Sequence, residues 1–210
     1  MPSRRTAIVA VLVFALAALG IAAYAIIELR NRPMAGAGWE AASDDAVPIG
    51  GAFELTDHTG RRVTRTDFAG KSLMVFFGFT HCPDVCPLAL NQIALTMVAL
   101  GDWAGQVQPL FITVDPERDT PQVMADYVAP FDAGIVGLTG SAEEIEAVEK
   151  SYRAYARKVE AESAADGYTM DHSAIIYLMG PDGRFITLFD ASDTPDAMAI
   201  EIAAQIDADS

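Results

Sequence analysis

Two cysteines lie four residues apart in the segment Cys82-Pro-Asp-Val-Cys86-Pro87, and they are the only cysteines in the chain. They directly follow residues 73–79, an almost continuous apolar run with the length of a strand buried on both faces. They precede residues 87–100, where apolar side chains recur at helical spacing. A thiol at the start of a helix lies near the positive end of the helix dipole, which lowers its pKa and favours the thiolate. Because thiolates bind metal ions and attack disulfides, the pair is a candidate metal or redox site.

The spacing of the two cysteines leaves their local conformation open. If the segment is helical, the two Cβ atoms lie about 5–6 Å apart on one face, and two thiolates can hold one ion or close a disulfide after a modest movement. Proline at position 87 disfavours the helical conformation of the preceding Cys86, so a loop that leads into the helix is the alternative. Two buried cysteines that act only as small apolar side chains are the remaining interpretation.

Redox chemistry is a second hypothesis for the same two thiols. Thioredoxin-type oxidoreductases normally have two residues between their cysteines, whereas this chain has three. Peroxidases related to thioredoxin carry a threonine three residues before the reactive cysteine. Here that position is Phe79 for Cys82 and Pro83 for Cys86. Peroxidase chemistry is therefore disfavoured, while thiol–disulfide exchange stays open.

A metal site needs a third ligand, because two thiolates leave the coordination shell incomplete. Of the three histidines, His58 adjoins a predicted turn and is expected to be solvated, and His81 is expected to be packed or exposed rather than a ligand. His172, in Tyr-Thr-Met-Asp-His172-Ser, lies at the start of a predicted strand, which in thioredoxin-like folds faces the cysteine loop. A Cys₂His set suits copper, since thiolates select Cu(I) and imidazole also retains Cu(II). Structural zinc takes four protein ligands.

Three further side chains are candidates for a role beside the metal. Asp115 and Asp119 follow the second predicted buried strand, residues 110–114, where a carboxylate could orient a ligand or occupy an extra position on Cu(II). The alternative is that both are ordinary turn and helix-cap residues. Met170 is either an axial thioether or a core side chain that fills a gap.

The surrounding pattern predicts an α/β domain. A β-hairpin is expected over residues 53–64 and a second one over 174–189, with a final helix over 194–206. Between the hairpins, buried strands (73–79, 110–114 and 135–138) alternate with helices (87–100, 120–128 and 141–157). This alternation predicts a mixed sheet with helices on both faces, a thioredoxin-like fold with an N-terminal β-hairpin and insertions. The cysteine loop then lies at the carboxyl end of a strand, where open α/β sheets place their chemistry.

A membrane anchor is predicted before this domain. Residues 7–27 form a 21-residue run without a formal charge, which as a helix spans roughly 31 Å, close to the thickness of the hydrocarbon layer. A cleaved signal peptide usually has an apolar region of only about 7–15 residues. We therefore expect an anchor with its flanks (1–32), a flexible linker (33–50) and the thioredoxin-like domain (51–210). The lack of an arginine- and serine-rich presequence favours the bacterial inner membrane, with the domain in the periplasm.

The charge distribution excludes one class of partner. Residues 1–32 contain four of the 14 basic and one of the 29 acidic side chains, so residues 33–210 hold 10 basic and 28 acidic ones, a net charge of −18. Such a body repels phosphate backbones, and the sequence contains no basic patch to offset this. Nucleic acid is therefore not an expected partner.

Three motifs of the chain resemble the Sco/SenC family. They are Phe77-Gly-Phe-Thr-His-Cys-Pro-Asp-Val-Cys-Pro87, Val114-Asp-Pro-Glu-Arg-Asp-Thr-Pro121 and Asp171-His-Ser. The resemblance covers roughly residues 48–207. It implies a copper-binding assembly factor that helps to install the Cu(A) centre in subunit II of cytochrome c oxidase, with metal ligands at Cys82, Cys86 and His172. It also implies that an unidentified periplasmic donor supplies the copper.

The same resemblance keeps two other functions open. Family members are credited with thiol–disulfide exchange that keeps the cysteines of the recipient reduced, and this role would use the same two sulfurs. A copper or redox sensor that acts through protein contacts would share the site as well. A metallochaperone that is not itself an enzyme is the preferred hypothesis.

Overall fold

The computed structural model describes residues 48–162, 164 and 166–208. The predicted anchor, and all of the predicted linker except residues 48–50, lie outside the described residues. Among the described residues, one helical stretch, Val85–Gln106, is long and apolar enough to cross a membrane by length and composition alone. It belongs to the folded domain, where one of its faces is buried.

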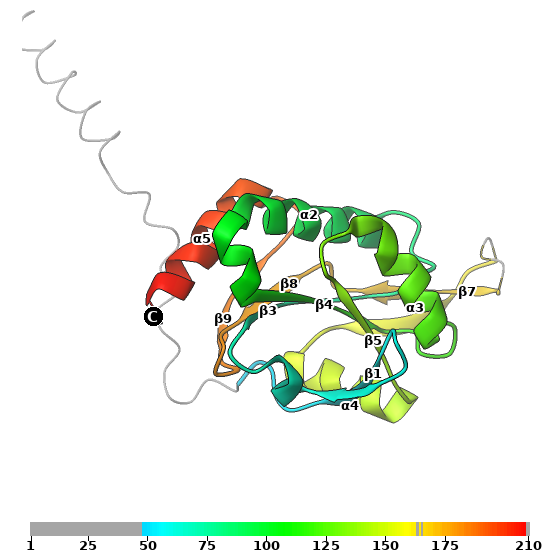
Figure 1. The fold of residues 1–210 in the computed structure, drawn as a ribbon. Helices are drawn as coiled ribbons and strands as arrows, with labels where there is room; N and C mark the ends of the chain where they lie inside the picture. Colours follow the sequence, from blue (N-terminus) through cyan, green and yellow to red (C-terminus); the bar gives the residue numbers. More distant parts are fainter. Residues whose placement is uncertain (1–47, 163, 165, 209–210) are drawn as a thin grey trace, which may run out of the picture. The chain divides into compact units, whose positions relative to one another are not determined.

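A seven-stranded mixed sheet forms the centre of the domain (Figure 1). The strand order is β2-β1-β5-β4-β3-β8-β9; the pairs β3–β4 and β4–β5 are parallel and the other pairs are antiparallel. Its strands are β1 (Glu54–Asp57), β2 (Arg62–Thr64), β3 (Ser72–Gly78), β4 (Val107–Thr113), β5 (Val136–Thr139), β8 (Ile176–Met179) and β9 (Phe185–Phe189). Every residue of β3 is buried, as its continuous apolar sequence predicts for a central strand.

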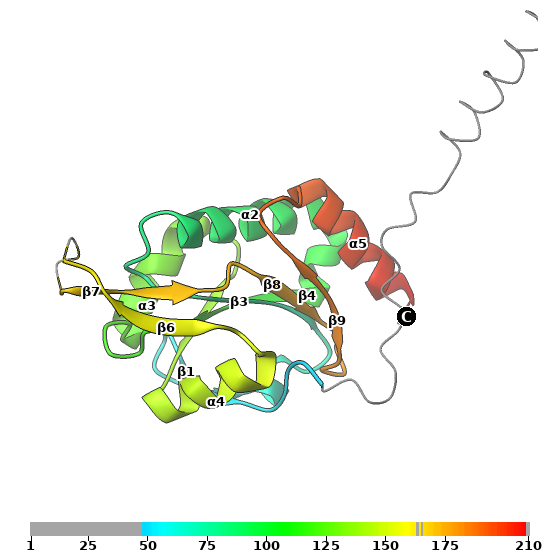
Figure 2. The ribbon, with the colours of Figure 1, turned by 180° about the vertical axis from the view of Figure 1, so that it is seen from behind.

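Helices cover both faces of this sheet, which confirms the predicted arrangement. Figures 1 and 2 show α2 and α5 side by side on one face and α4 on the opposite side. The α-helices are α2 (Val85–Leu100), α3 (Pro121–Val128), α4 (Ala142–Tyr152) and α5 (Pro195–Ala208), and the short 3₁₀ helices are η1 (Arg65–Phe68), η2 (Gly101–Gln106) and η3 (Ala129–Phe131).

Local capping signals determine where two of the helices begin. Thr120 is the N-cap of α3 and accepts a hydrogen bond from the backbone N–H of Val123, with Pro121 at the first helical position. Ser141 and Glu144 form the predicted capping box at the start of α4. Both starts are therefore confirmed at the predicted residues.

The end of α4 corrects the prediction of a helix to residue 157. The helix ends at Tyr152, because Arg153 adopts the left-handed conformation (φ 55°) and its N–H bonds to the carbonyls of Glu149 and Lys150. The chain then forms β6 (Ala156–Glu160), which pairs with β7 (Tyr168–His172) in a separate two-stranded sheet. Both strands are polar and partly exposed, so they lack the apolar alternation that predicts a strand.

The start of α2 also differs from the prediction. The helix begins at Val85, two residues before the predicted position, so that Pro87 is its third residue. Proline is tolerated there because the first four N–H groups of a helix have no partner within the helix. Cys86 therefore belongs to the helix, whereas Cys82 lies in the loop that leads into it.

Gly78, the last residue of β3, allows α2 to approach the sheet closely. A Cβ atom at this position would lie 2.6 Å from Cys86 Sγ and 3.0 Å from side-chain atoms of Phe76 and Phe111. Two of these neighbours are aromatic rings in the core and cannot move freely.

Gly78→Ala should therefore destabilise the domain by about 1–3 kcal/mol through overpacking and lower its Tm by several degrees. Gly105→Ala is the matched control, because no atom lies within 4 Å of the position of its added Cβ. Thermal unfolding followed by circular dichroism checks both variants, and equal Tm values for the two would contradict the packing argument.

Candidate metal centre

The two cysteines occupy the junction between β3 and α2. Cys82 lies in the loop before the helix and Cys86 is the second helical residue, so the pair does not lie on one helical face. The backbone N–H of Cys86 donates to Cys82 Sγ, with an N–S distance of 3.4 Å. Cys82 thus accepts one of the N–H groups that the helix start leaves free, close to the positive end of the helix dipole.

His172, the last residue of β7, completes a group of three potential ligands. Its Nε2 lies 3.4 Å from Cys86 Sγ, and the ligand atoms of Cys82, Cys86 and His172 all lie within 4.8 Å of one another. Its Nδ1 lies 3.1 Å from the carbonyl oxygen of Ser173, which can only accept. The Nδ1 proton is therefore engaged, and the lone pair of Nε2 faces the two sulfurs.

The two thiols share their charge unequally. A hydrogen bond from the Cys86 thiol lowers the pKa of Cys82 far below its ordinary value. The interaction with the Cys82 thiolate, together with burial, raises the pKa of Cys86. In the metal-free protein, Cys82 is therefore the more acidic of the two thiols. Cys86 is fully buried, whereas Cys82 is partly exposed, so that a partner can reach Cys82 first.

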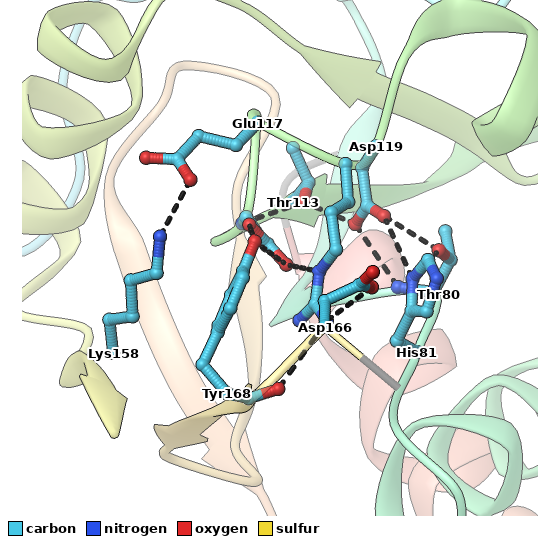
Figure 3. A network of polar contacts seen from close by, with 10 residues as sticks. Thr80, His81, Thr113, Glu117, Asp119, Lys158, Asp166 and Tyr168 are labelled. Carbon is cyan, nitrogen blue, oxygen red and sulfur yellow. Dashed lines mark hydrogen bonds and ion pairs between the residues drawn. The ribbon is translucent and has the colours of Figure 1, made fainter. Parts of the chain in front are cut away.

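The two predicted carboxylates lie behind the cysteine loop rather than among the three ligand atoms. Asp119 is fully buried and accepts hydrogen bonds from the Thr80 N–H (3.0 Å), the Thr80 hydroxyl (2.6 Å) and the Thr113 hydroxyl (2.5 Å) (Figure 3). Asp115 accepts from Arg118 and from the Tyr168 hydroxyl. Among the described residues, neither carboxylate belongs to a group that could hold a metal ion with these three ligands. The turn-and-cap alternative agrees with the backbone: Asp115 begins a turn that its carbonyl closes, and Thr120, directly after Asp119, is the N-cap of α3.

The remaining predicted candidates lie elsewhere. His58, which was expected to be solvated beside a turn, is partly exposed, and its Nδ1 accepts from the Gly137 N–H at 3.1 Å, beside the pairing of β1 with β5. His81 is about half exposed, and its Nδ1 lies 3.1 Å from the Thr80 hydroxyl (Figure 3). Met170 packs against the edge of the core.

Sequence reasoning missed two residues of this region, Arg118 and Tyr168. The guanidinium of Arg118 lies 3.8 Å from the centre of the Tyr168 ring and donates to Asp115. Arg118 lies inside one of the three motifs, between Asp115 and Asp119, but nothing in its spacing indicates its contact with a residue 50 positions away.

Iodoacetamide should alkylate the metal-free, reduced protein at Cys82 first. Because alkylation requires the thiolate, the rate should reach its plateau well below the ordinary cysteine pKa of about 8.5. Cys86→Ala removes the hydrogen-bond donor, so the pH midpoint of Cys82 alkylation should move upward. Mass spectrometry of digested protein, sampled from about pH 4 to pH 9, measures both rates. Equal alkylation of the two cysteines at every pH would contradict the unequal sharing of charge.

Solved structures share this fold. The structure of Bradyrhizobium japonicum ScoI with copper bound is 47% identical, covers 74% of this chain and 98% of that chain, and has a TM-score of 0.69. BsSco, described as a member of the Sco family of cytochrome c oxidase assembly proteins with a disulfide switch, is 23% identical. Its likeness, with a TM-score of 0.59 over 80% of this chain and 96% of that chain, concerns the fold alone.

The sequence also matches part of several curated proteins. "Protein sco1" of Schizosaccharomyces pombe is 44% identical over 158 residues, which are 74% of this chain and 60% of that protein. The chain thus spans somewhat less than two thirds of the length of this relative. A model of the SCO1/SenC family matches residues 41–207, which include all three candidate ligands. The chain has the two sulfurs and one imidazole that suit copper, and it shares its fold with copper-bound ScoI. Because the family model also matches most of the chain, the chain belongs to the SCO1/SenC family.

Proposed function

We propose that this chain is a membrane-anchored copper metallochaperone that holds one copper ion through Cys82, Cys86 and His172. The observation that carries the proposal is the convergence of two sulfurs and one imidazole nitrogen within 4.8 Å. Two thiolates form a site for Cu(I), and the imidazole adds the nitrogen donor that Cu(II) favours. The acceptor would be the Cu(A) site of cytochrome c oxidase subunit II, and a periplasmic protein would be the copper donor.

Delivery of copper requires that a thiol of the partner reaches the ion while the donor still holds it. Cys86 is buried and Cys82 is partly exposed, so ligand exchange can begin at Cys82 while Cys86 keeps the ion attached. The proposed location, with residues 7–27 in the bacterial inner membrane and the domain in the periplasm, places the site on the side where subunit II carries its copper centre.

A groove beside the ligands offers a surface for the acceptor protein. It has a volume of about 390 Å³, and Asp193 is its one charged residue. The groove is lined by Val85, Leu88, Ala89, Asn91, Gln92, Leu95, Ala174, Ala191, Asp193 and Pro195. It begins at Val85, between the two cysteines, and at Ala174, two residues after His172. Apolar side chains of subunit II in this groove would bring the thiols of subunit II next to Cys82.

The thiolate–thiol pair also favours a second candidate function, reduction of the cysteines of the oxidase copper site. One low-pKa sulfur beside one buried thiol is the arrangement that attack on a disulfide and subsequent resolution require. In this function His172 would contribute little, because no step of thiol–disulfide exchange needs a third ligand. Its substitution therefore separates the two candidates.

Titration of the full-length chain in detergent micelles with Cu(I) and with Cu(II) should give one tightly bound ion per chain. Cys82→Ser and Cys86→Ser should abolish binding of both ions, and His172→Ala should weaken Cu(II) binding by at least about tenfold more than Cu(I) binding, since two thiolates suffice for Cu(I). Equal loss of both ions in His172→Ala would contradict this division. Strong disulfide reductase activity with only loosely bound copper would favour the second candidate.

Leu88→Asp should slow the transfer of Cu(I) to the copper-free soluble domain of subunit II by about tenfold, while transfer to a small thiol chelator stays unchanged. Leu88 is 64% exposed in the groove. The matched control is Val98→Asp, because Val98 is 79% exposed on the same helix but does not line the groove. Stopped-flow absorption measures the rates, and the same rate for the two variants would rule out docking in the groove.

A further inference from the structure

The three ligands come from two parts of the fold that the main sheet does not connect. Cys82 and Cys86 are placed by β3 and α2, whereas His172 ends β7, which belongs to the separate β6–β7 sheet. Residues 173–175 connect His172 to β8. Within the described part of the chain, no ladder of backbone hydrogen bonds joins β7 to the seven-stranded sheet. Other contacts must set the distance between Nε2 and the sulfurs.

One loop, residues 115–119 between β4 and α3, contacts the cysteine side of the site. Asp119 binds the backbone N–H and the hydroxyl of Thr80, two residues before Cys82, and it is tied to β4 through the Thr113 hydroxyl (Figure 3). With an exposure of 0%, the carboxylate has no competing water. These hydrogen bonds hold the chain that leads into the cysteine loop.

The same loop contacts the histidine side of the site. The Tyr168 ring, at the other end of β7, lies between the guanidinium of Arg118 and the ammonium of Lys158, each 3.8 Å from the ring centre. The Tyr168 hydroxyl donates to Asp115 at 3.1 Å, and Lys158 forms an ion pair with Glu117 at 2.6 Å (Figure 3). Contacts from the 115–119 loop therefore hold both strands of the β6–β7 sheet.

Arg118 is the residue that links these contacts to the imidazole. Its side chain is 12% exposed, its Nη1 lies 3.4 Å from the Tyr168 carbonyl oxygen, and its Nη2 is buried without a hydrogen-bond partner. Its bond to Asp115 and its contact with the Tyr168 ring hold the guanidinium in this place. The guanidinium also lies 5.9 Å from the centre of the Phe79 ring, which packs edge-on against His172 at 5.6 Å.

The loop itself is internally braced. The N–H groups of Arg118 and Asp119 both bond to the carbonyl of Asp115, at 3.2 and 3.0 Å. The Asp115 N–H bonds to the Thr113 hydroxyl at 2.9 Å. The contacts to the cysteine side and to the histidine side thus originate from one compact turn at the end of β4.

We propose that the 115–119 loop sets the distance between the cysteine pair and His172, with Asp119 as a positioning residue for the cysteines and Arg118, together with Tyr168, as positioning residues for the imidazole. This inference rests on the proposed copper function. It assigns different roles to Arg118 and Asp119. Loss of the contact between Arg118 and Tyr168 disturbs only the nitrogen ligand. Loss of the hydrogen bonds between Asp119 and Thr80 disturbs the two sulfurs, which both Cu(I) and Cu(II) need.

Copper titration of full-length variants tests this assignment. Arg118→Met and Tyr168→Leu should weaken Cu(II) binding by about 10–100-fold, the usual effect of losing a group that orients a ligand. They should also shift the Cu(II) absorption and electron paramagnetic resonance spectra towards those of His172→Ala, and leave Cu(I) binding within about twofold of the wild type. Tyr168→Phe keeps the ring and loses only the hydroxyl, so its effect should be smaller in the same direction. Asp119→Asn should weaken the binding of both ions.

A double variant separates positioning from general destabilisation. If Arg118 acts through His172, Arg118→Met should add no further loss of Cu(II) binding in the His172→Ala background. Arg62→Met is the matched control, because it removes another arginine ion pair, with Glu144 at 2.6 Å, and the contacts of Arg62 with Glu54, Thr56 and Glu144 do not involve the 115–119 loop. It should leave both affinities and the Cu(II) spectra unchanged. Equal weakening of Cu(I) and Cu(II) in Arg118→Met, or full additivity in the double variant, would overturn the inference.

The ring resonances of His172 in the metal-free protein provide a readout that does not depend on copper. Nuclear magnetic resonance should show them shifted in Arg118→Met and unshifted in Arg62→Met. Failure of the wild type to bind either ion would refute the proposed function without affecting this measurement. Unshifted His172 resonances in a folded Arg118→Met protein would refute the positioning role even if the wild type binds copper.

Discussion

The junction between the end of β3 and the start of α2 is the constraint on which the candidate site depends. Because β3 is buried on both faces between two neighbouring strands, its carboxyl end has a single position in the domain. Gly78 at that end leaves the space that the Cys86 sulfur occupies. The backbone N–H of Cys86, in the first turn of α2, then bonds to Cys82 Sγ. One local arrangement thus determines the charge on Cys82, the burial of Cys86 and the separation of the two sulfurs.

The site combines a rigid support with one accessible ligand. Behind the cysteines lie buried, fully engaged polar groups such as Asp119 and Thr113, which hold the loop without exposing it to water. In front of them, Cys82 is partly exposed beside a groove whose one charged residue is Asp193. In the proposed function this asymmetry separates two tasks, since the buried sulfur retains the ion while the exposed one exchanges it. The same asymmetry would serve thiol–disulfide exchange, which explains why family membership alone does not separate the two candidate functions.

Local sequence signals predicted most of the fold. The apolar run of β3, the N-cap Thr120 and the capping box at Ser141 act over a few residues, and their predicted positions agree with the structure. The predicted end of α4 was wrong, because the left-handed conformation of Arg153 depends on the chain that follows it. Strands β6 and β7 were missed for a related reason: they are polar, half-exposed strands whose pairing has no apolar periodicity to reveal it.

The sequence by itself determined that two thiols stand at the start of a helix after a buried strand, because strand burial, helix caps and cysteine spacing are properties of neighbouring residues. Only the tertiary structure decided that the imidazole of His172 lies 3.4 Å from the sulfur of a cysteine 86 positions earlier. The roles of Asp119, Arg118 and Tyr168 belong to the same category. Their contacts join segments far apart in the chain, and local conformational preference carries no information about how a polar strand packs against a distant loop.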